Sequence, residues 1–155
     1  MIVDDLLPLR ENNGESETLF AGIGPDSALW VPILEKAFAK YQGNYAHIVG
    51  GDPRWAVRTL TGAPYDMDSH GNDDTIDALW NRVLAHNAAG DILMAGTPNG
   101  SDTTTNSDGL VQGHAYNILD LLVLSNGQRL VKMQNPWSSE TYRGDWSDES
   151  SLWTS

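Results

Sequence analysis

Hydrophobic residues recur at helical spacing in the segment 30–41, which predicts a first α-helix. Asp26 or Ser27 is the predicted N-cap, and Gly43 follows the end of the pattern. Pro32 fits this helix only if it lies in the first turn, where its missing N–H is not needed.

A second helix is predicted between Asp74, as its N-cap, and Gly90, which follows its last turn. Asp77 stands three residues after Asp74, as in a capping box. Five large apolar residues at helical spacing form one face of this helix: Ile76, Leu79, Trp80, Val83 and Leu84.

Glycine and proline punctuate the first third of the chain. Residues 1–24 alternate short apolar runs with turn residues, which predicts strands joined by a turn at Asn13-Gly14. Gly50-Gly51-Asp52-Pro53 separates two patterned regions and is the predicted domain boundary.

Three apolar segments in the second half predict strands at 92–95, 115–124 and 129–133. The last two flank Ser125-Asn126-Gly127, the signature of a β-hairpin. The polar stretch 96–109 between the first two is either a solvated connector or a flap that gates a cleft.

The candidate chemistry lies at the ends of that hairpin, where His114 precedes one strand and Asn135 follows the other. A histidine becomes a general base when one ring nitrogen is held by a fixed acceptor. A tight turn at Asn126-Gly127 would place His114 opposite Ser139, four residues beyond Asn135. Contact between the two side chains therefore predicts a wider loop or a bulge near 120–124.

Composition excludes several classes of function. The net charge is −12 over 155 residues, and no basic stripe is present, so nucleic acid and anionic membranes are not expected partners. No apolar run approaches the ~18 residues of a membrane span, and Asp4 and Asp5 stand where a signal peptide would be basic. We therefore expect a soluble, intracellular, cytoplasmic protein. The chain has no cysteine, which excludes disulfides and a cysteine nucleophile within it.

Motifs along most of the chain resemble the calpain family of papain-like cysteine endopeptidases. The resemblance implies an α+β, papain-like fold with a β-rich His/Asn lobe. Residues 1–52 would be the C-terminal part of lobe 1, and 53–155 would be lobe 2, truncated at its C-terminal end. The motifs are Val3-Asp4-Asp5-Leu6-Leu7-Pro8, Leu34-Glu35-Lys36-Ala37-Phe38-Ala39-Lys40, Gly43-Asn44-Tyr45, Gly50-Gly51, Leu60-Thr61-Gly62, Gly109-Leu110-Val111-Gln112-Gly113-His114-Ala115-Tyr116 and Asn135-Pro136-Trp137.

The resemblance also implies roles for five residues. His114 would be the general base, Asn135 would orient its imidazole, and Trp137 would shield their hydrogen bond from water. Gly51 and Gly113 would present backbone groups to an extended peptide substrate.

Calcium is the cofactor that the resemblance implies, but the ligand positions are degraded. Asp148 retains an acidic ligand, whereas Ala28 and Thr141 stand where the family carries acidic residues, with Glu140 one residue out of register. The acidic segment 66–77 resembles part of a twelve-residue calcium loop but lacks an entering helix, so a helix-capping loop explains it better.

The family's nucleophile segment is not found in this sequence. The chain is therefore interpreted as a fragment of a calpain-like cysteine endopeptidase, inactive alone because it has no cysteine. Its partners would be a protein or peptide substrate and the missing N-terminal part of the protease. Two alternatives stay open: a catalytically dead binding or scaffold module, and a calcium-binding module centred on 66–77.

Overall fold

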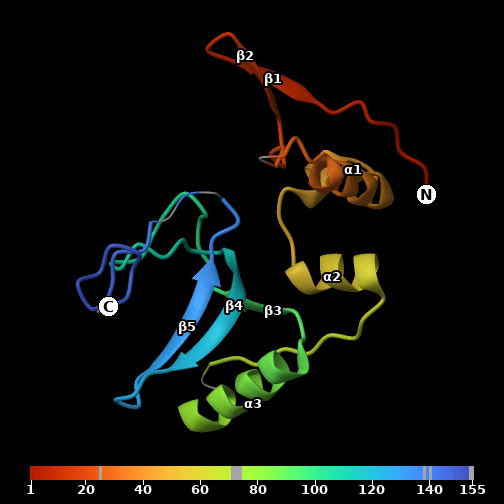
Figure 1. The fold of residues 1–155 in the computed structure, drawn as a ribbon. Helices are drawn as coiled ribbons and strands as arrows, with labels where there is room; N and C mark the ends of the chain where they lie inside the picture. The colour runs from red at the N-terminus through yellow and green to blue at the C-terminus, as the bar shows by residue number, and fades with distance from the viewer. Residues whose placement is uncertain (25, 71–74, 138, 140, 154–155) are drawn as a thin grey trace. The chain divides into compact units, whose positions relative to one another are not determined.

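The computed structural model describes residues 1–24, 26–70, 75–137, 139 and 141–153. Within them, the chain forms three α-helices, a short 3₁₀-helix and two small antiparallel sheets, which confirms the predicted α+β class (Figure 1). Backbone contacts divide the chain into two compact units, Met1–Asp66 and Met67–Ser155. The assignment of residues 1–52 and 53–155 to two protease lobes stays a prediction.

Unit 1 begins with a hairpin in which β1 (Leu9–Asn12) pairs with β2 (Glu15–Thr18). Asn13 has φ 53° and Gly14 has φ 87°, the positive values that a type I′ turn requires. The turn was predicted correctly. The strands, however, consist of the mainly polar residues next to the turn, because turn geometry rather than the flanking apolar runs sets the pairing.

Helix α1 (Trp30–Gln42) follows the predicted apolar pattern, with Pro32 in its first turn and Gly43 at its C-cap with φ 111°. Its N-cap differs from the prediction. Residues 26–27 belong to a preceding turn, where Ser27 has φ 57°, and Leu29 becomes the N-cap without any side-chain hydrogen bond.

Helix α2 (Pro53–Thr61) was not predicted, and it follows the short 3₁₀-helix η1 (Tyr45–Ile48). The carboxylate of Asp52 accepts a hydrogen bond from the Arg54 backbone N–H at 3.0 Å. Gly62 ends the helix with φ 72°. The Asp-Pro pair that indicates a boundary is thus also a helix start, with an N-cap followed by proline at the first helical position.

Unit 2 contains α3 (Ile76–Ala89), which ends at Gly90 with φ 80° as predicted. The predicted cap, Asp74, lies outside the described residues. The hydroxyl of Thr75 is the N-cap, accepting from the Ala78 N–H at 3.1 Å. Thr75 is the last residue with extended backbone before the helix, which is the position where a cap must stand.

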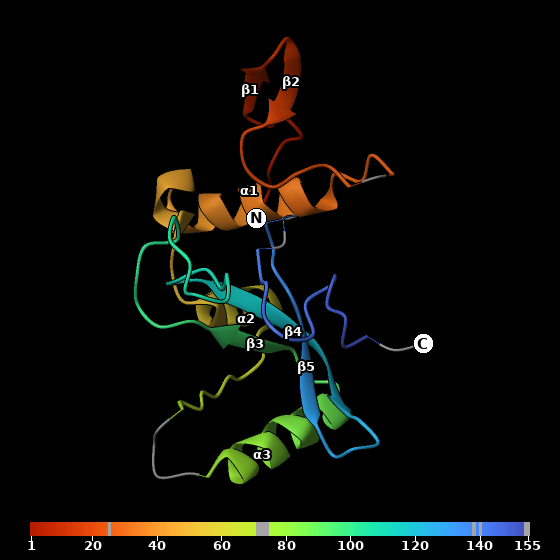
Figure 2. The same ribbon diagram turned by 90° about the vertical axis from the view of Figure 1, so that its left-hand side faces the viewer.

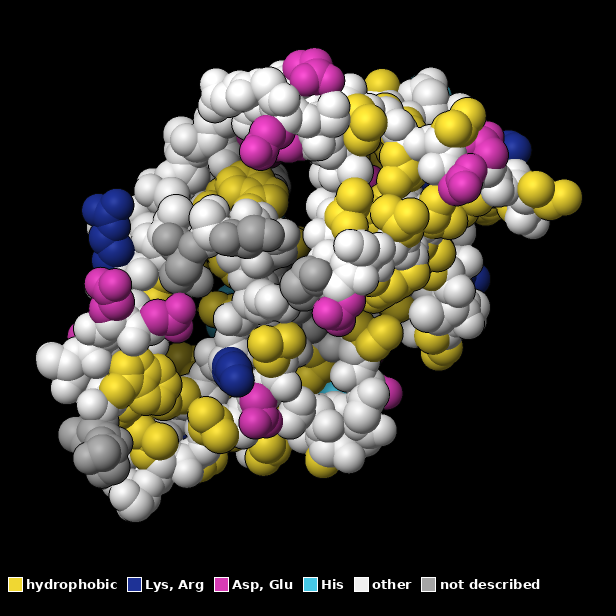
Figure 3. All heavy atoms as spheres, turned by 45° about the horizontal axis from the view of Figure 1, so that its top comes forward, with side chains coloured by type: hydrophobic (Ala, Val, Ile, Leu, Met, Phe, Trp, Pro, Cys, Tyr) yellow, Lys and Arg dark blue, Asp and Glu magenta, His cyan; other side chains and the backbone are white. Residues whose placement is uncertain are grey.

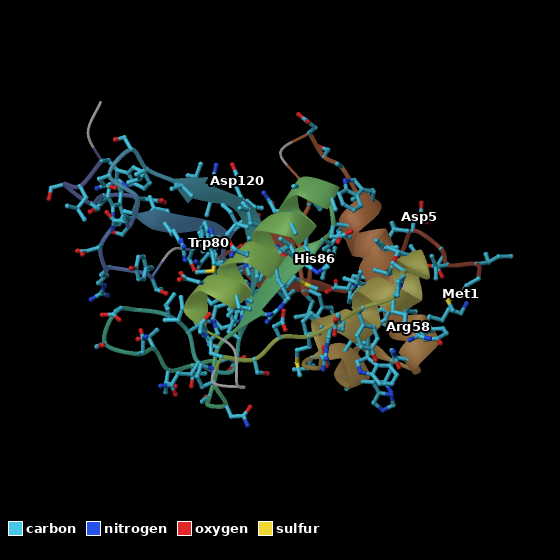
Figure 4. The ribbon with its side chains drawn as sticks, turned by 90° about the horizontal axis from the view of Figure 1, so that it is seen from below. Met1, Asp5, Arg58, Trp80, His86 and Asp120 are labelled. Atoms are coloured by element: carbon cyan, nitrogen blue, oxygen red, sulfur yellow. The ribbon has the colours of Figure 1, made fainter. Side chains whose placement is uncertain are left out.

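The sheet of unit 2 has the antiparallel order β3-β4-β5, formed by Leu93–Gly96, Ala115–Val123 and Arg129–Gln134. Figure 2 shows β4 between its two neighbours. Helix α3 packs beside this sheet (Figure 4). The Arg129 guanidinium lies 5.3 Å from the centre of the Trp80 ring, a cation–π contact that joins β5 to α3.

The β4–β5 register contains the predicted irregularity. Val123 pairs with Arg129 across a loop wider than a two-residue turn, and a bulge lies between Ile118 and Asp120. The bulge stands just before the segment 120–124 where it was expected. It shifts the pairing by one residue, which brings the start of β4 nearer to the end of β5.

The buried hydrophobic core is small and centres on unit 2. Val111, Tyr116 and Leu121 are buried there, and Pro32 and Ala39 are buried in unit 1. Many large apolar side chains are exposed, and yellow patches of them are visible in Figure 3. Among the described residues, no helix is both long and apolar enough to cross a membrane.

Candidate active site

The backbone of His114 is fixed where β3 and β4 stop pairing. The last strand pair is Gly96 with Ala115, and Thr97 and His114 come next. The Thr97 N–H donates to the His114 carbonyl at 2.9 Å, and the His114 N–H donates to the Thr97 hydroxyl at 2.9 Å. The end of the sheet thus holds His114 by both its N–H and its carbonyl group.

The imidazole of His114 contacts the Asn135 carboxamide across the end of the hairpin. The distance from His114 Nε2 to Asn135 Oδ1 is 2.9 Å, and Asn135 is only 8% exposed. Asn135 is itself held by its own loop. The Trp137 N–H donates to Oδ1 at 3.1 Å, and Nδ2 donates to the Ser139 carbonyl at 3.1 Å.

These two backbone contacts determine which end of the Asn135 amide faces the histidine. A backbone N–H can only donate and a carbonyl can only accept, so Oδ1 faces Trp137 and His114 while Nδ2 faces Ser139. His114 Nε2 must then carry the hydrogen. In the neutral ring this leaves the Nδ1 lone pair as the basic site. Within the described residues, Nδ1 has no hydrogen-bond partner, so it is available to a nucleophile.

Two aromatic rings flank the imidazole. The Trp137 ring centre lies 4.3 Å from that of His114 at 50°, and the buried Tyr116 ring meets the imidazole edge-on at 5.0 Å and 89°. Trp137 is 45% exposed. It therefore covers one side of the His114–Asn135 pair without enclosing it.

The two predicted substrate glycines belong to different units. Gly113, next to His114, has φ 57°, and a Cβ there would lie 2.5 Å from the Gly100 carbonyl oxygen. This close approach within the chain already requires glycine, whatever substrate binds. Gly51 belongs to unit 1, has φ 157°, and would place a Cβ within 4 Å of no other atom. The structure brings together His114, Asn135, Trp137 and Gly113.

The loop before His114 is fastened to the segment after Asn135. The Thr141 hydroxyl donates to the Gly109 carbonyl at 2.7 Å, and the Arg143 N–H donates to the Asp108 carbonyl at 2.7 Å. Gly109 has φ 88°, and a Cβ there would lie 1.8 Å from the Thr141 carbonyl oxygen. In this structure the stretch 96–109 is thus attached at its C-terminal end.

The residues expected to bind calcium do not form a suitable cage. Asp148 is exposed, and no group of three or more potential metal ligands occurs within the part of the chain that the structure describes. Glu140 lies outside the described residues, and Thr141 donates to Gly109. Burial raises the pKa of the neighbouring Tyr142 phenol, with nearby Asp108 adding to the effect, so this hydroxyl stays neutral. Among the described residues, Asp148 thus has no cluster of acidic side chains around it that could hold a calcium ion with it.

One residue of the site was missed in the sequence. Thr97 falls in a stretch interpreted as a loop, and its position directly after the apolar segment 92–95 is the sole signal that could have found it. A hydroxyl residue at a strand end is common, so the sequence pattern alone does not distinguish it.

The α+β fold, with a histidine–asparagine pair at the end of its sheet, is of the papain-like class. A family model described as "Calpain family cysteine protease" matches residues 1–155, so the chain belongs to the calpain family of cysteine proteases.

Curated relatives agree with this family. A rice calpain-type cysteine protease, ADL1, is 41% identical over 99% of this chain and 7% of its own length. Human Calpain-14 is 33% identical and the rat Calpain-1 catalytic subunit 32% identical, each over 99% of this chain and 22% of the relative. The chain thus spans less than a quarter of the length of each of these three relatives.

Proposed function

We propose that this chain supplies the proton-handling side of a calpain-like cysteine endopeptidase, which cleaves peptide bonds in proteins by acyl transfer to a thiol. The observation that carries the proposal is the hydrogen bond between His114 Nε2 and the buried, doubly anchored Asn135. It leaves Nδ1 as the base. Because the chain has no cysteine, the thiol would come from a segment outside these 155 residues.

In the proposed reaction, His114 Nδ1 takes the proton of the cysteine thiol, and the thiolate attacks the substrate carbonyl carbon. Asn135 Oδ1 accepts the Nε2 hydrogen throughout and stabilises the imidazolium that forms. The imidazolium then gives its proton to the leaving amine as the C–N bond breaks. A water molecule, deprotonated by the same Nδ1, finally releases the acyl group and restores the thiol.

The substrate would be an extended protein or peptide segment. Gly113 adjoins the base, and its N–H donates to the Pro98 carbonyl at 2.8 Å, so its own carbonyl is the group that could contact a substrate backbone. Gly51 would supply the contact from lobe 1. No step of the proposed reaction uses calcium, because the described residues place no cluster of acidic ligands around Asp148.

The test is complementation with the missing nucleophile. The purified chain alone should not cleave casein. Mixing it with the segment of the rice relative that precedes the matched region should yield cleavage that thiol alkylation blocks. His114→Ala should lower that rate at least about 100-fold, since general acid–base catalysis contributes that much. His86→Ala, which removes an exposed histidine paired with Asp91, should leave the rate unchanged.

Cleavage that is indifferent to His114→Ala would contradict the proposal. So would thiol-dependent cleavage by the purified chain alone, because no residue of the chain can supply the thiol.

A second candidate is a catalytically dead calpain-like module that binds or scaffolds other proteins. The complete lack of cysteine favours it. On this hypothesis His114 and Asn135 are inherited structure, and calorimetry should detect binding of peptides or partner proteins with the same affinity for the wild type and His114→Ala. Absence of any measurable affinity would remove this candidate.

A further inference from the structure

We infer that Thr97 is a positioning residue for the general base, an inference that rests on the role proposed for His114. Its hydroxyl replaces a backbone group at the end of the β3–β4 ladder. In a regular antiparallel pair, two residues exchange N–H···O=C bonds between their backbones. Here Thr97 N–H donates to the His114 carbonyl, but the return bond from His114 N–H goes to the Thr97 side chain.

The same hydroxyl has its own proton to donate, because it accepts from the His114 N–H. Its shortest acceptor is the Val111 carbonyl at 2.7 Å, whereas the His114 carbonyl lies at 3.2 Å. Thr97 therefore joins the N–H of His114 to the carbonyl of Val111, three residues earlier in the chain. These two hydrogen bonds to one hydroxyl hold the segment from Val111 to His114 in a fixed turn.

Val111 is the fixed point of this arrangement. It is 2% exposed, and its N–H donates to the Tyr116 hydroxyl at 3.0 Å. Both backbone polar groups of Val111 are thus bound by side chains, Thr97 on the carbonyl and Tyr116 on the N–H. The Tyr116 ring also meets the imidazole edge-on. Movement of Val111 would therefore shift the His114 backbone, through Thr97, and the Tyr116 ring that contacts the imidazole.

Few residue types could take the place of Thr97. The role needs a short side chain that accepts and donates at once, which only serine and threonine hydroxyls provide at this length. Valine has the same shape and neither capacity. The prediction is that removing the hydroxyl loosens His114 relative to Asn135, while serine keeps the contact.

The test reads the His114–Asn135 hydrogen bond directly by NMR on the full chain labelled with ¹⁵N-histidine. The Nε2 proton of His114 should be observable and exchange slowly with water, and His114→Gln assigns the signal. Thr97→Val should raise the exchange rate of this proton about tenfold, because the variant loses one hydrogen bond that holds His114 in place. Thr97→Ser should restore the wild-type rate. Thr105→Val is the matched control, because that exposed threonine bridges to Val111 through its backbone.

A Nε2 proton that exchanges at the wild-type rate in Thr97→Val would overturn the inference. If Thr97→Val does not fold, hydrogen–deuterium exchange of the His114 amide in the wild type and in Thr97→Ser decides. Protection in both supports the hydroxyl as its acceptor, and free exchange in both overturns it. None of these readouts involves hydrolysis, so a chain that fails complementation yet depends on Thr97 would disprove the proposed function while still showing that Thr97 positions the His114 ring against Asn135.

Discussion

The Asn135 amide presents its oxygen to His114 because backbone groups of Trp137 and Ser139 bind the two ends of that amide. Oδ1 accepts from the Trp137 N–H, and Nδ2 donates to the Ser139 carbonyl. The tautomer of the histidine is therefore set by the loop that follows β5, through residues two and four positions beyond the asparagine. A change in that loop would act on the proton of a residue from another strand.

Asn135→Ala should destabilise the chain as well as free the imidazole. It leaves a backbone N–H and a carbonyl near a buried position without their partners, at a cost of about 1–3 kcal/mol. Urea unfolding measures this loss. The control is Asn117→Ala, an exposed residue of β4, which should stay within about 0.5 kcal/mol of the wild type. Equal losses in the two variants would show that the Asn135 contacts contribute nothing to stability.

Two glycines with nearly the same φ should respond very differently to alanine. Gly127 has φ 83° and open space beside it, whereas a Cβ on Gly109, at φ 88°, would lie 1.8 Å from the Thr141 carbonyl oxygen. Gly127→Ala should cost about 1–2 kcal/mol from the left-handed backbone alone. Gly109→Ala adds a steric clash of about 1–3 kcal/mol and should separate the loop from Thr141.

Thermal unfolding of both variants checks the difference, and hydrogen exchange at the Arg143 amide reports the attachment of the loop. If Gly109→Ala is no less stable than Gly127→Ala and keeps the Arg143 amide protected, the two segments are not held together as the structure has them.

The sequence predicted turns and helix ends best, at positions where the backbone needs a residue that tolerates positive φ. Asn13-Gly14 predicts its turn because both residues tolerate positive φ, and Gly43 and Gly90 mark helix ends for the same reason. Counting residues along the hairpin predicted that contact between His114 and Asn135 requires an irregular register, and the structure contains both the contact and a bulge. Local chemistry and register are therefore readable from the chain.

The elements that were missed depend on tertiary context. Helix α2 has an Asp-Pro start and a glycine end, but its nine residues show too short an apolar pattern to stand out from a boundary. Leu29 caps α1 without a polar side chain because the preceding turn sets its backbone. Thr97 acts through a hydrogen bond to a residue seventeen positions away, which no local pattern reveals.

The helix cap at Asp52 should depend on pH in a stated direction. Hydrogen bonds from the Arg54 guanidinium, including Nε to Oδ1 at 2.9 Å, hold the pKa of Asp52 below its ordinary value of 3.8. A lowered pKa in the folded state means that the contribution to stability is complete above the ordinary value and is lost as the pH falls through the lowered one. Arg54→Met should return the pKa toward 3.8, as followed by NMR of the Asp52 carboxyl carbon. An unchanged titration in that variant would assign the shift to another group.

Trp137→Ala should speed the exchange of the His114 Nε2 proton without breaking its bond to Asn135. The indole lies 4.3 Å from the imidazole and covers one side of the pair, so its removal admits water to a hydrogen bond that stays geometrically intact. The expected change is several-fold, smaller than for loss of the Thr97 hydroxyl, because Trp137 is already 45% exposed. Trp55→Ala, which replaces an exposed tryptophan on α2 in unit 1, is the control and should leave the proton unaffected.

The Asn135 side-chain amide signals should keep their wild-type positions in Trp137→Ala, since the backbone N–H of residue 137 still donates to Oδ1. A shift of those signals together with faster exchange would mean that the indole orients the asparagine instead of shielding it.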